Sequence, residues 1–151
     1  MANIRIKKKY ANLVDDCYGA TAPFRTQAQL ASFCAMYAFN KSVKITSAKV
    51  TGGQEIRDNV LDDIEYRTQI EMLAVAHTKE PEVLLDDEET KNKRYKIFED
   101  YVNAGLEIFQ EKKDKRPLDT NGLDTVLSIL REQTKDNLQV ESGQGMAEPD
   151  F

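Results

Sequence analysis

The amino-acid sequence predicts a mostly α-helical domain: a compact bundle of about five helices, with a small hairpin or irregular segment near residues 43–57. Three observations lead to this prediction. Apolar residues recur at spacings of three and four through most of residues 1–131. Capping residues, prolines and glycines divide this stretch into segments of ordinary helix length. β-branched residues and a Gly-Gly turn signal are concentrated between residues 41 and 60.

The composition is that of one soluble domain with a real hydrophobic core, with 151 residues, 40% hydrophobic and 31% charged. No apolar stretch approaches the roughly 18 residues that a membrane span needs, and the basic start MANIRIKKKY lacks the apolar region of a secretory signal. We therefore expect a cytoplasmic protein that does not enter a membrane. The net charge of −5 argues against a broad nucleic-acid surface, although it does not exclude a local basic patch.

The first two helices have clear patterns. IKKKYANLVDDC (residues 6–17) carries apolar residues three and four apart and is followed by Gly19, which predicts a short amphipathic helix. A second helix is expected over residues 27–39, because Thr26 and Gln29 form a T-x-x-Q capping box at its start. Its apolar residues surround nearly the whole cylinder, which is typical of a central, buried helix.

Two helices are expected in the second half of the domain before the last loop. Periodic apolar residues predict a third helix over residues 62–78, which Pro81 terminates. After a short apolar turn, a long helix is expected to run to about Lys112, with Asp86 or Asp87 as its N-cap.

The last predicted helix starts at Leu123 and ends near Glu132, with Thr120 or Asn121 as its cap. The residues that follow are polar and rich in Gly, Ser and Gln. Such a composition is typical of disorder. The sequence therefore predicts a single helical domain over residues 1–131 and a disordered C-terminal tail over 132–151.

The long helix contains two poor helix formers at its centre, Asn103 and Gly105. A central glycine costs about 1 kcal/mol relative to alanine. Gly105 falls on the same face as the apolar residues of this helix. We therefore expect it to point inward, where a bare backbone lets the helix over residues 27–39 cross closely. For Asn103 two interpretations stay open: it faces solvent, or its amide holds a neighbouring loop.

The residues that catalysis or metal binding would need are few. His77, the single histidine, lies on an apolar stripe, which favours a hydrogen-bonded residue at the core boundary over a catalytic base. Cys17 and Cys34 form no CxxC motif, and in the cytoplasm free buried thiols are expected rather than a disulfide. The acidic pairs and runs are at helix ends, where capping explains them; they are residues 15–16, 62–63 and 86–89. We expect no catalytic residue, metal ligand or cofactor.

Two basic clusters could neutralise DNA phosphates. They comprise Arg5, Lys7, Lys8 and Lys9 near the start of the chain, and Lys91, Lys93, Arg94 and Lys96 in the long helix. Contacts of this kind position a protein on DNA without reading its sequence. Both clusters fit solvated helix faces equally well.

The stretch KIFEDYVNAGLEIF, together with PFRTQAQLASFCAMYAF and IEMLAVAHTKEPEVLLDDEE upstream, resembles a small family of bacterial and archaeal defence proteins. This is the family of DNA phosphorothioation-associated (Dnd system-associated) protein four. The last of the family's hallmark segments is a helix that carries E-x-Y-x-N-G-G-L-E, and Ala104 replaces the first of these two glycines here. The matching motif residues are Glu99, Tyr101, Asn103, Gly105, Leu106 and Glu107.

This resemblance implies a context more than a mechanism. Such proteins are encoded beside antiviral systems that replace a non-bridging phosphate oxygen of DNA with sulfur, or that restrict DNA lacking this mark. The resemblance therefore predicts a non-catalytic accessory protein of modification or restriction that binds larger protein components of the system. The alternative is a small DNA-binding module that uses the basic N-terminal helix. A catalytic subunit would require residues 86–89 to converge with His77 around a metal.

Overall fold

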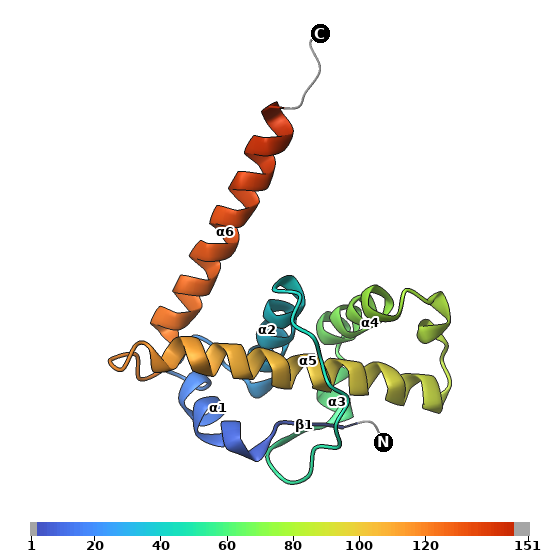
Figure 1. The fold of residues 1–151 in the computed structure, drawn as a ribbon. Coiled ribbons are helices and arrows are strands. Elements are labelled where there is room, and N and C mark those ends of the chain that lie inside the picture. Colours follow the sequence, from blue (N-terminus) through green and yellow to red (C-terminus); the bar gives the residue numbers. More distant parts are fainter. Residues whose placement is uncertain (1–2, 147–151) are drawn as a thin grey trace.

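The computed structural model describes residues 3–146, with side chains described as far as residue 138. It confirms the mostly helical fold. The long helix α5 (Glu88–Asp114) runs through the middle of the molecule, and the other elements pack along it (Figure 1). These elements are β1 (Ile4–Arg5), α1 (Ala11–Cys17), α2 (Gln27–Asn40), β2 (Glu55–Ile56), α3 (Asp58–Leu61), α4 (Ile64–Thr78) and α6 (Leu123–Met146), with 3₁₀ turns η1 (Lys8–Tyr10) and η2 (Pro81–Leu84). No helix in the described residues is long and apolar enough to cross a membrane; the cytoplasmic location stays a prediction.

Helix α2 starts where its capping box predicts. The backbone N–H of Gln29 donates to Thr26 Oγ1 over 3.2 Å, and the Gln29 side chain accepts from the backbone N–H of Arg25 over 2.9 Å. The second bond of the box therefore reaches one residue upstream of the cap. The first bond satisfies a donor that a helix start leaves unpaired, and the second fixes the residue before the cap.

The predicted crossing of α2 over α5 is confirmed at Gly105. A Cβ atom placed on Gly105 would lie 1.9 Å from the carbonyl oxygen of Cys34, in the middle of α2. Because the two backbones touch here, α2 and α5 share the centre of the core. Phe98, Phe109, Leu30, Leu106 and Ile70 are among the largest fully buried side chains of this core.

The predicted first helix over residues 6–17 is wrong at its beginning. The helix starts only at Ala11, after the η1 turn, and Ile4 and Ile6 lie in an extended segment. This segment pairs antiparallel with β2, with Ile4 opposite Ile56, and the N–H of Ile6 donates to the Gln54 carbonyl over 2.8 Å. Backbone groups that a helix would use are therefore bonded to a distant strand.

Residues 43–54 form no helix or strand, so of the two predicted alternatives, a small hairpin or an irregular segment, the irregular segment is confirmed. Gly52 and Gly53 do make a turn, with φ of +74° and +75°. The strand that follows this turn, β2, pairs with β1 rather than with the residues just before it. The β-branched residues thus signal extended chain but not its partner.

The other helix starts are close to their predicted positions. Helix α4 begins at Ile64, two residues later than predicted, because Asp63 is its N-cap and accepts from the N–H of Glu65 over 3.2 Å. Of the two candidates for α5, Asp87 is the cap: its Oδ1 accepts from the N–H of Thr90 over 2.8 Å.

Helix α6 is longer than predicted, because it continues past Glu132 to Met146 and leaves the body of the molecule (Figure 1). The Glu132 carboxylate still binds the body, through Lys41 and Lys112. Residues 147–151 lie outside the described residues. The division into a domain of residues 1–131 and a disordered tail of 132–151 therefore stays a prediction.

Candidate functional site

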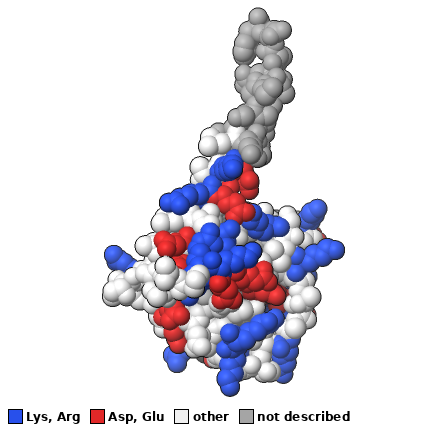
Figure 2. Space-filling view, turned by 60° about the vertical axis from the view of Figure 1, so that its left-hand side comes forward, with Lys and Arg blue, Asp and Glu red and all other residues white. Residues whose placement is uncertain are grey.

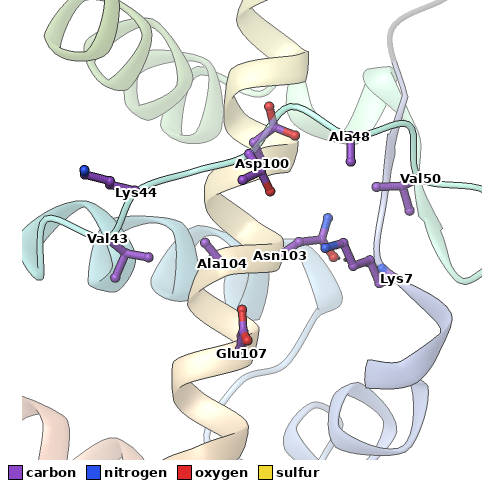
Figure 3. Close-up of a pocket in the computed structure, with 10 residues that line it drawn as sticks. Lys7, Val43, Lys44, Ala48, Val50, Asp100, Asn103, Ala104 and Glu107 are labelled. Atoms are coloured by element: carbon purple, nitrogen blue, oxygen red, sulfur yellow. Dashed lines mark hydrogen bonds between the residues drawn. The ribbon is translucent and has the colours of Figure 1, made fainter.

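The motif residues lie in the middle of α5, where three other segments meet this helix. Helix α2 packs beneath it, the N-terminal strand runs along one side, and residues 43–50 cross its outer face (Figure 3). Residues three and four apart on a helix share a face. Glu99 and Asn103 therefore point together toward the N-terminal strand, while Gly105 faces α2.

Glu99 and Asn103 hold the free edge of β1. Glu99 Oε2 accepts from the N–H of Arg5 over 2.8 Å. The Asn103 amide accepts from the N–H of Lys7 over 2.8 Å through Oδ1, and its Nδ2 donates to the Arg5 carbonyl over 3.0 Å. Since the opposite edge of the strand is bonded to β2, both edges of this short strand are satisfied. Of the two interpretations of Asn103, the one in which it holds a neighbouring segment is confirmed.

Lys96 and Asp100 attach the crossing segment on the same stretch of α5. Lys96 Nζ lies 2.8 Å from Glu99 Oε1 and 3.2 Å from Asp100 Oδ1, and it also donates to the Ala48 carbonyl. Burial raises the pKa of Asp100, while the Lys96 ammonium opposes that rise. This ion cluster therefore ties residues 43–50 to the motif.

A small cavity lies between these segments. Its volume is about 60 Å³, and Lys7, Asn103 and Glu107 form part of its wall (Figure 3). Pockets that enclose small ligands usually measure about 300–1,000 Å³, whereas this volume suits a few water molecules. The cavity is therefore too small for a nucleotide.

Tyr101 and His77 join α5 to α4. His77 Nδ1 lies 2.9 Å from the Tyr101 hydroxyl oxygen, and the Tyr101 ring also packs edge-on against Phe39. The predicted hydrogen bond of His77 is thus present, although the ring is exposed rather than at the core boundary. In the described part of the chain, no three His, Cys, Asp or Glu side chains are grouped as metal ligands would be.

The rest of the motif divides between core and surface. Leu106 is fully buried, and the backbone of Gly105 packs directly against α2. Glu107 is the exposed member of the motif. The motif therefore acts mainly by internal contacts that hold the N-terminal strand, α2 and α4 around α5.

Comparison with known families decides the affiliation of the chain. The model of the family described as DNA sulphur modification system-associated protein 4 matches residues 3–146. The chain belongs to this family. Comparisons with curated proteins and with solved structures gave no match. The resemblance predicted from the sequence is confirmed, and the match covers nearly the whole chain.

The structure shows where the residues of the two predicted basic clusters lie. In the first cluster, Arg5 lies 3.7 Å from Glu55, and Lys7 lines the small cavity together with Glu107. Lys8 and Lys9 are exposed, and the Lys9 ammonium lies over its neighbouring Tyr10 ring. Carboxylates thus accompany two of the four cations.

The residues of the second basic cluster have different surroundings in the structure and do not form one basic surface. Arg94 is 6% exposed and donates to the Val83 and Leu85 carbonyls over 2.8 Å each, so it holds η2 in place. Lys91 faces Asp62 at 3.8 Å, and Lys96 is bound within the ion cluster. Lys93 is exposed beside carboxylates of η2.

One structural residue, Asp119, was not predicted from the helical spacings and capping patterns used above. Asp119 is buried, and its Oδ2 accepts from the N–H of Thr125 over 2.9 Å and from the Thr125 hydroxyl over 2.6 Å. It therefore caps the start of α6 from a more distant position than the predicted Asn121, which accepts from the N–H of Leu123 over 3.1 Å. The D-x-x-x-x-x-T spacing of Asp119 and Thr125 was the signal available.

The two cysteines are free and buried, as predicted. Burial raises the pKa of both thiols, that of Cys17 to about 12. Thiols protonated and enclosed in this way are poor nucleophiles. Both cysteines belong to the hydrophobic core of the chain.

Proposed function

We propose that the protein is a non-catalytic accessory protein of a DNA sulphur modification system, which binds a larger protein component of that system. The family name supports association with the system. The observation that carries the proposal is that the motif residues are used for internal contacts. Glu99, Asn103 and Gly105 are committed to backbone contacts inside the molecule, so the sequence feature that defines the family builds architecture.

An acidic groove between η2 and the start of α5 is the surface that we propose for the partner. It has a volume of about 850 Å³, and its charged lining residues are Glu80, Glu82, Asp87, Glu89 and Lys93. Leu85 lies in the same groove and is 57% exposed. An exposed apolar side chain among charged groups is typical of a protein interface. The excess of carboxylates suits a partner segment that is basic, as DNA-acting enzymes often carry.

Co-purification with the products of neighbouring genes tests this proposal. The variant Glu80→Lys/Glu82→Lys reverses two exposed charges in the groove and should reduce recovery of the partner about tenfold or more. The matched control Asp16→Lys/Glu111→Lys makes the same change of net charge at exposed positions outside the groove and should leave recovery unchanged. Equal loss with both variants would show a general charge effect and refute the groove. Failure of every neighbouring product to bind would refute the adaptor role.

The second candidate function is a small DNA-binding module. Lys8 and Lys9 support it, because both are exposed and neither forms an ion pair within the described residues. They could contact phosphates together with Lys7 and Arg5, without reading sequence. The nearby carboxylates and the net charge of −5 favour the adaptor.

A mobility-shift titration separates the two functions. A DNA-binding module should shift duplex DNA at micromolar protein and low salt, and the shift should weaken steeply as salt rises. Lys7→Glu/Lys8→Glu/Lys9→Glu should then abolish it. No shift by the unmodified chain, with either sulfur-modified or ordinary DNA, would remove this candidate.

A further inference from the structure

A row of exposed leucines on α6 takes no part in the motif or the acidic groove. Leu123, Leu127, Leu130 and Leu138 are 44%, 38%, 44% and 57% exposed. At 100° per residue they fall within an arc of about 80°. Thr134 lies in the same arc, and its hydroxyl donates to the Leu130 carbonyl over 2.9 Å, which leaves its methyl group outward. We call these five residues the leucine stripe.

The leucine stripe faces away from the body. Helix α6 packs on the body through Val126 and Ile129, which are 8% and 0% exposed, and through Thr125. The centre of the stripe lies roughly 130° around the helix from the centre of these buried residues. Since α6 leaves the body of the molecule (Figure 1), the stripe is accessible along its length.

We propose that the leucine stripe binds the stripe of a second copy of this chain, with the two α6 helices antiparallel and Leu127 on the two-fold axis. The spacing supports this arrangement. Leu123 lies about 6 Å before Leu127 along the helix, and Leu130 about 4.5 Å after it. Leu123 of each copy therefore meets Leu130 of the other, as a two-fold interface requires.

The charges beside the stripe have the same symmetry. Asp124 and Arg131 flank it on one side, line the same groove as Leu127, and form no ion pair within the described residues. In the antiparallel pair Asp124 of one copy lies within about 1.5 Å, along the axis, of Arg131 of the other. Two intermolecular ion pairs result. In a parallel pair Asp124 of one copy and Arg131 of the other would lie about 10 Å apart along the axis, so these ion pairs would not form.

Residues near the base of α6 allow further contacts in the proposed dimer, and the size of the leucine stripe indicates its affinity. Basic and acidic side chains lie next to one another around the base of α6 (Figure 2). Leu118, which is 93% exposed, lies in the loop before α6, toward which Leu138 of the second copy would extend. Four or five leucines per copy are few for a stable dimer, so we expect a dissociation constant on the order of 10–100 µM.

Sedimentation over a wide range of protein concentration tests the dimer. The unmodified chain should change from monomer to dimer, and Leu127→Glu, which sets two carboxylates on the axis, should stay monomeric. Leu85→Glu, the same change at an exposed leucine outside α6, should dimerise normally. Circular dichroism checks that each variant is folded. A monomeric unmodified chain at about 1 mM, or a dimeric Leu127→Glu variant, would overturn the proposal.

Charge exchange tests the antiparallel direction. Asp124→Arg and Arg131→Asp should each weaken self-association about tenfold, because like charges then meet twice in each dimer. A mixture of the two variants should form a heterodimer, in which every flanking pair is again of opposite charge. In addition, a mixture of Leu123→Cys and Leu130→Cys should oxidise to the heterodisulfide. Homodisulfides in its place would contradict the antiparallel arrangement, whereas loss of partner binding in the co-purification leaves this result unaffected.

Discussion

Two residues in the middle of α5 show how poor helix formers become necessary. Gly105 has no side chain because the Cys34 carbonyl occupies the place of its Cβ. Asn103, two residues earlier, uses its amide to accept from the N–H of Lys7 and to donate to the carbonyl of Arg5, on either side of Ile6. Each loses helix propensity and gains a contact that a better helix former could not make.

Whether Gly105→Ala stabilises or destabilises the folded protein is the sharpest test at the scale of single residues. On propensity alone alanine would stabilise the helix by about 1 kcal/mol. Because its Cβ would meet backbone atoms that cannot turn aside, we expect destabilisation of about 1–3 kcal/mol, and more for Gly105→Leu. Urea denaturation measures the change. Ala104→Gly, the reverse change at the next residue, supplies the propensity term, and a stabilised Gly105→Ala would contradict the helix crossing.

Asn103→Ala should release one edge of β1. It leaves the N–H of Lys7 and the carbonyl of Arg5 without their partner on α5, which we expect to cost about 1–3 kcal/mol. Amide hydrogen exchange gives a local measure: the Lys7 N–H should lose protection. The Arg5 N–H, which Glu99 binds, serves as the control within the same spectrum. Exposed Glu107→Ala should change stability by less than about 0.5 kcal/mol.

At the scale of elements, α6 depends on a few polar contacts at its first turns. Asp119 accepts from Thr125, and Glu132 accepts from Lys112 over 2.9 Å and also binds Lys41. Burial opposes ionisation of Asp119, but the hydrogen bonds from Thr125 outweigh it and lower its pKa. The attachment of α6 is therefore electrostatic as well as apolar, and it should respond to pH.

Glu132→Gln should remove part of this pH response. Hydrogen bonds from Lys41 and Lys112 lower the pKa of Glu132 from 4.5 to about 2. A carboxylate whose pKa is lowered in the folded state adds stability above its ordinary pKa, and this stability is lost as pH falls through the folded value. The stability difference from the unmodified chain should thus be present above about pH 4.5 and vanish toward pH 2. Because the pairs are partly exposed, about 0.2–1 kcal/mol each is expected, decreasing with salt.

Thermal unfolding from pH 2 to 7 measures the effect of Glu132→Gln. A difference that is constant over this range would assign the loss to packing instead of charge. Gln110→Ala removes an exposed hydrogen bond to Asp114 within α5, on another face of the helix from Lys112, and gives a control in the same helix. Its effect on α6 should be negligible at every pH.

At the scale of the whole molecule, sequence reasoning succeeded where the information is local. The capping box at Thr26 and the inward Gly105 are read from neighbours within one helix. The pairing of β1 with β2 could not be predicted in this way, because strands of two residues have no periodicity and their partner is far along the chain. For the candidate site, the motif residues were found by resemblance, whereas burial of Arg94 depends on η2 folding back over it. The true end of α6 was missed because a polar composition fits a solvated helix as well as a disordered tail.

The boundary of the folded domain gives a final prediction. Glu132 is the residue through which α6 last binds Lys41 and Lys112, while Lys135, Asp136 and Leu138 are exposed. A chain that ends at Gln133 should therefore keep the body intact, with a melting temperature within about 2 °C of the full chain at concentrations where both are monomeric. A chain that ends at Asn121 should lose several degrees, because it exposes the surface that Val126 and Ile129 cover. A large loss already at Gln133 would mean that residues 134–151 belong to the folded domain, against the boundary at residue 131 predicted from the sequence.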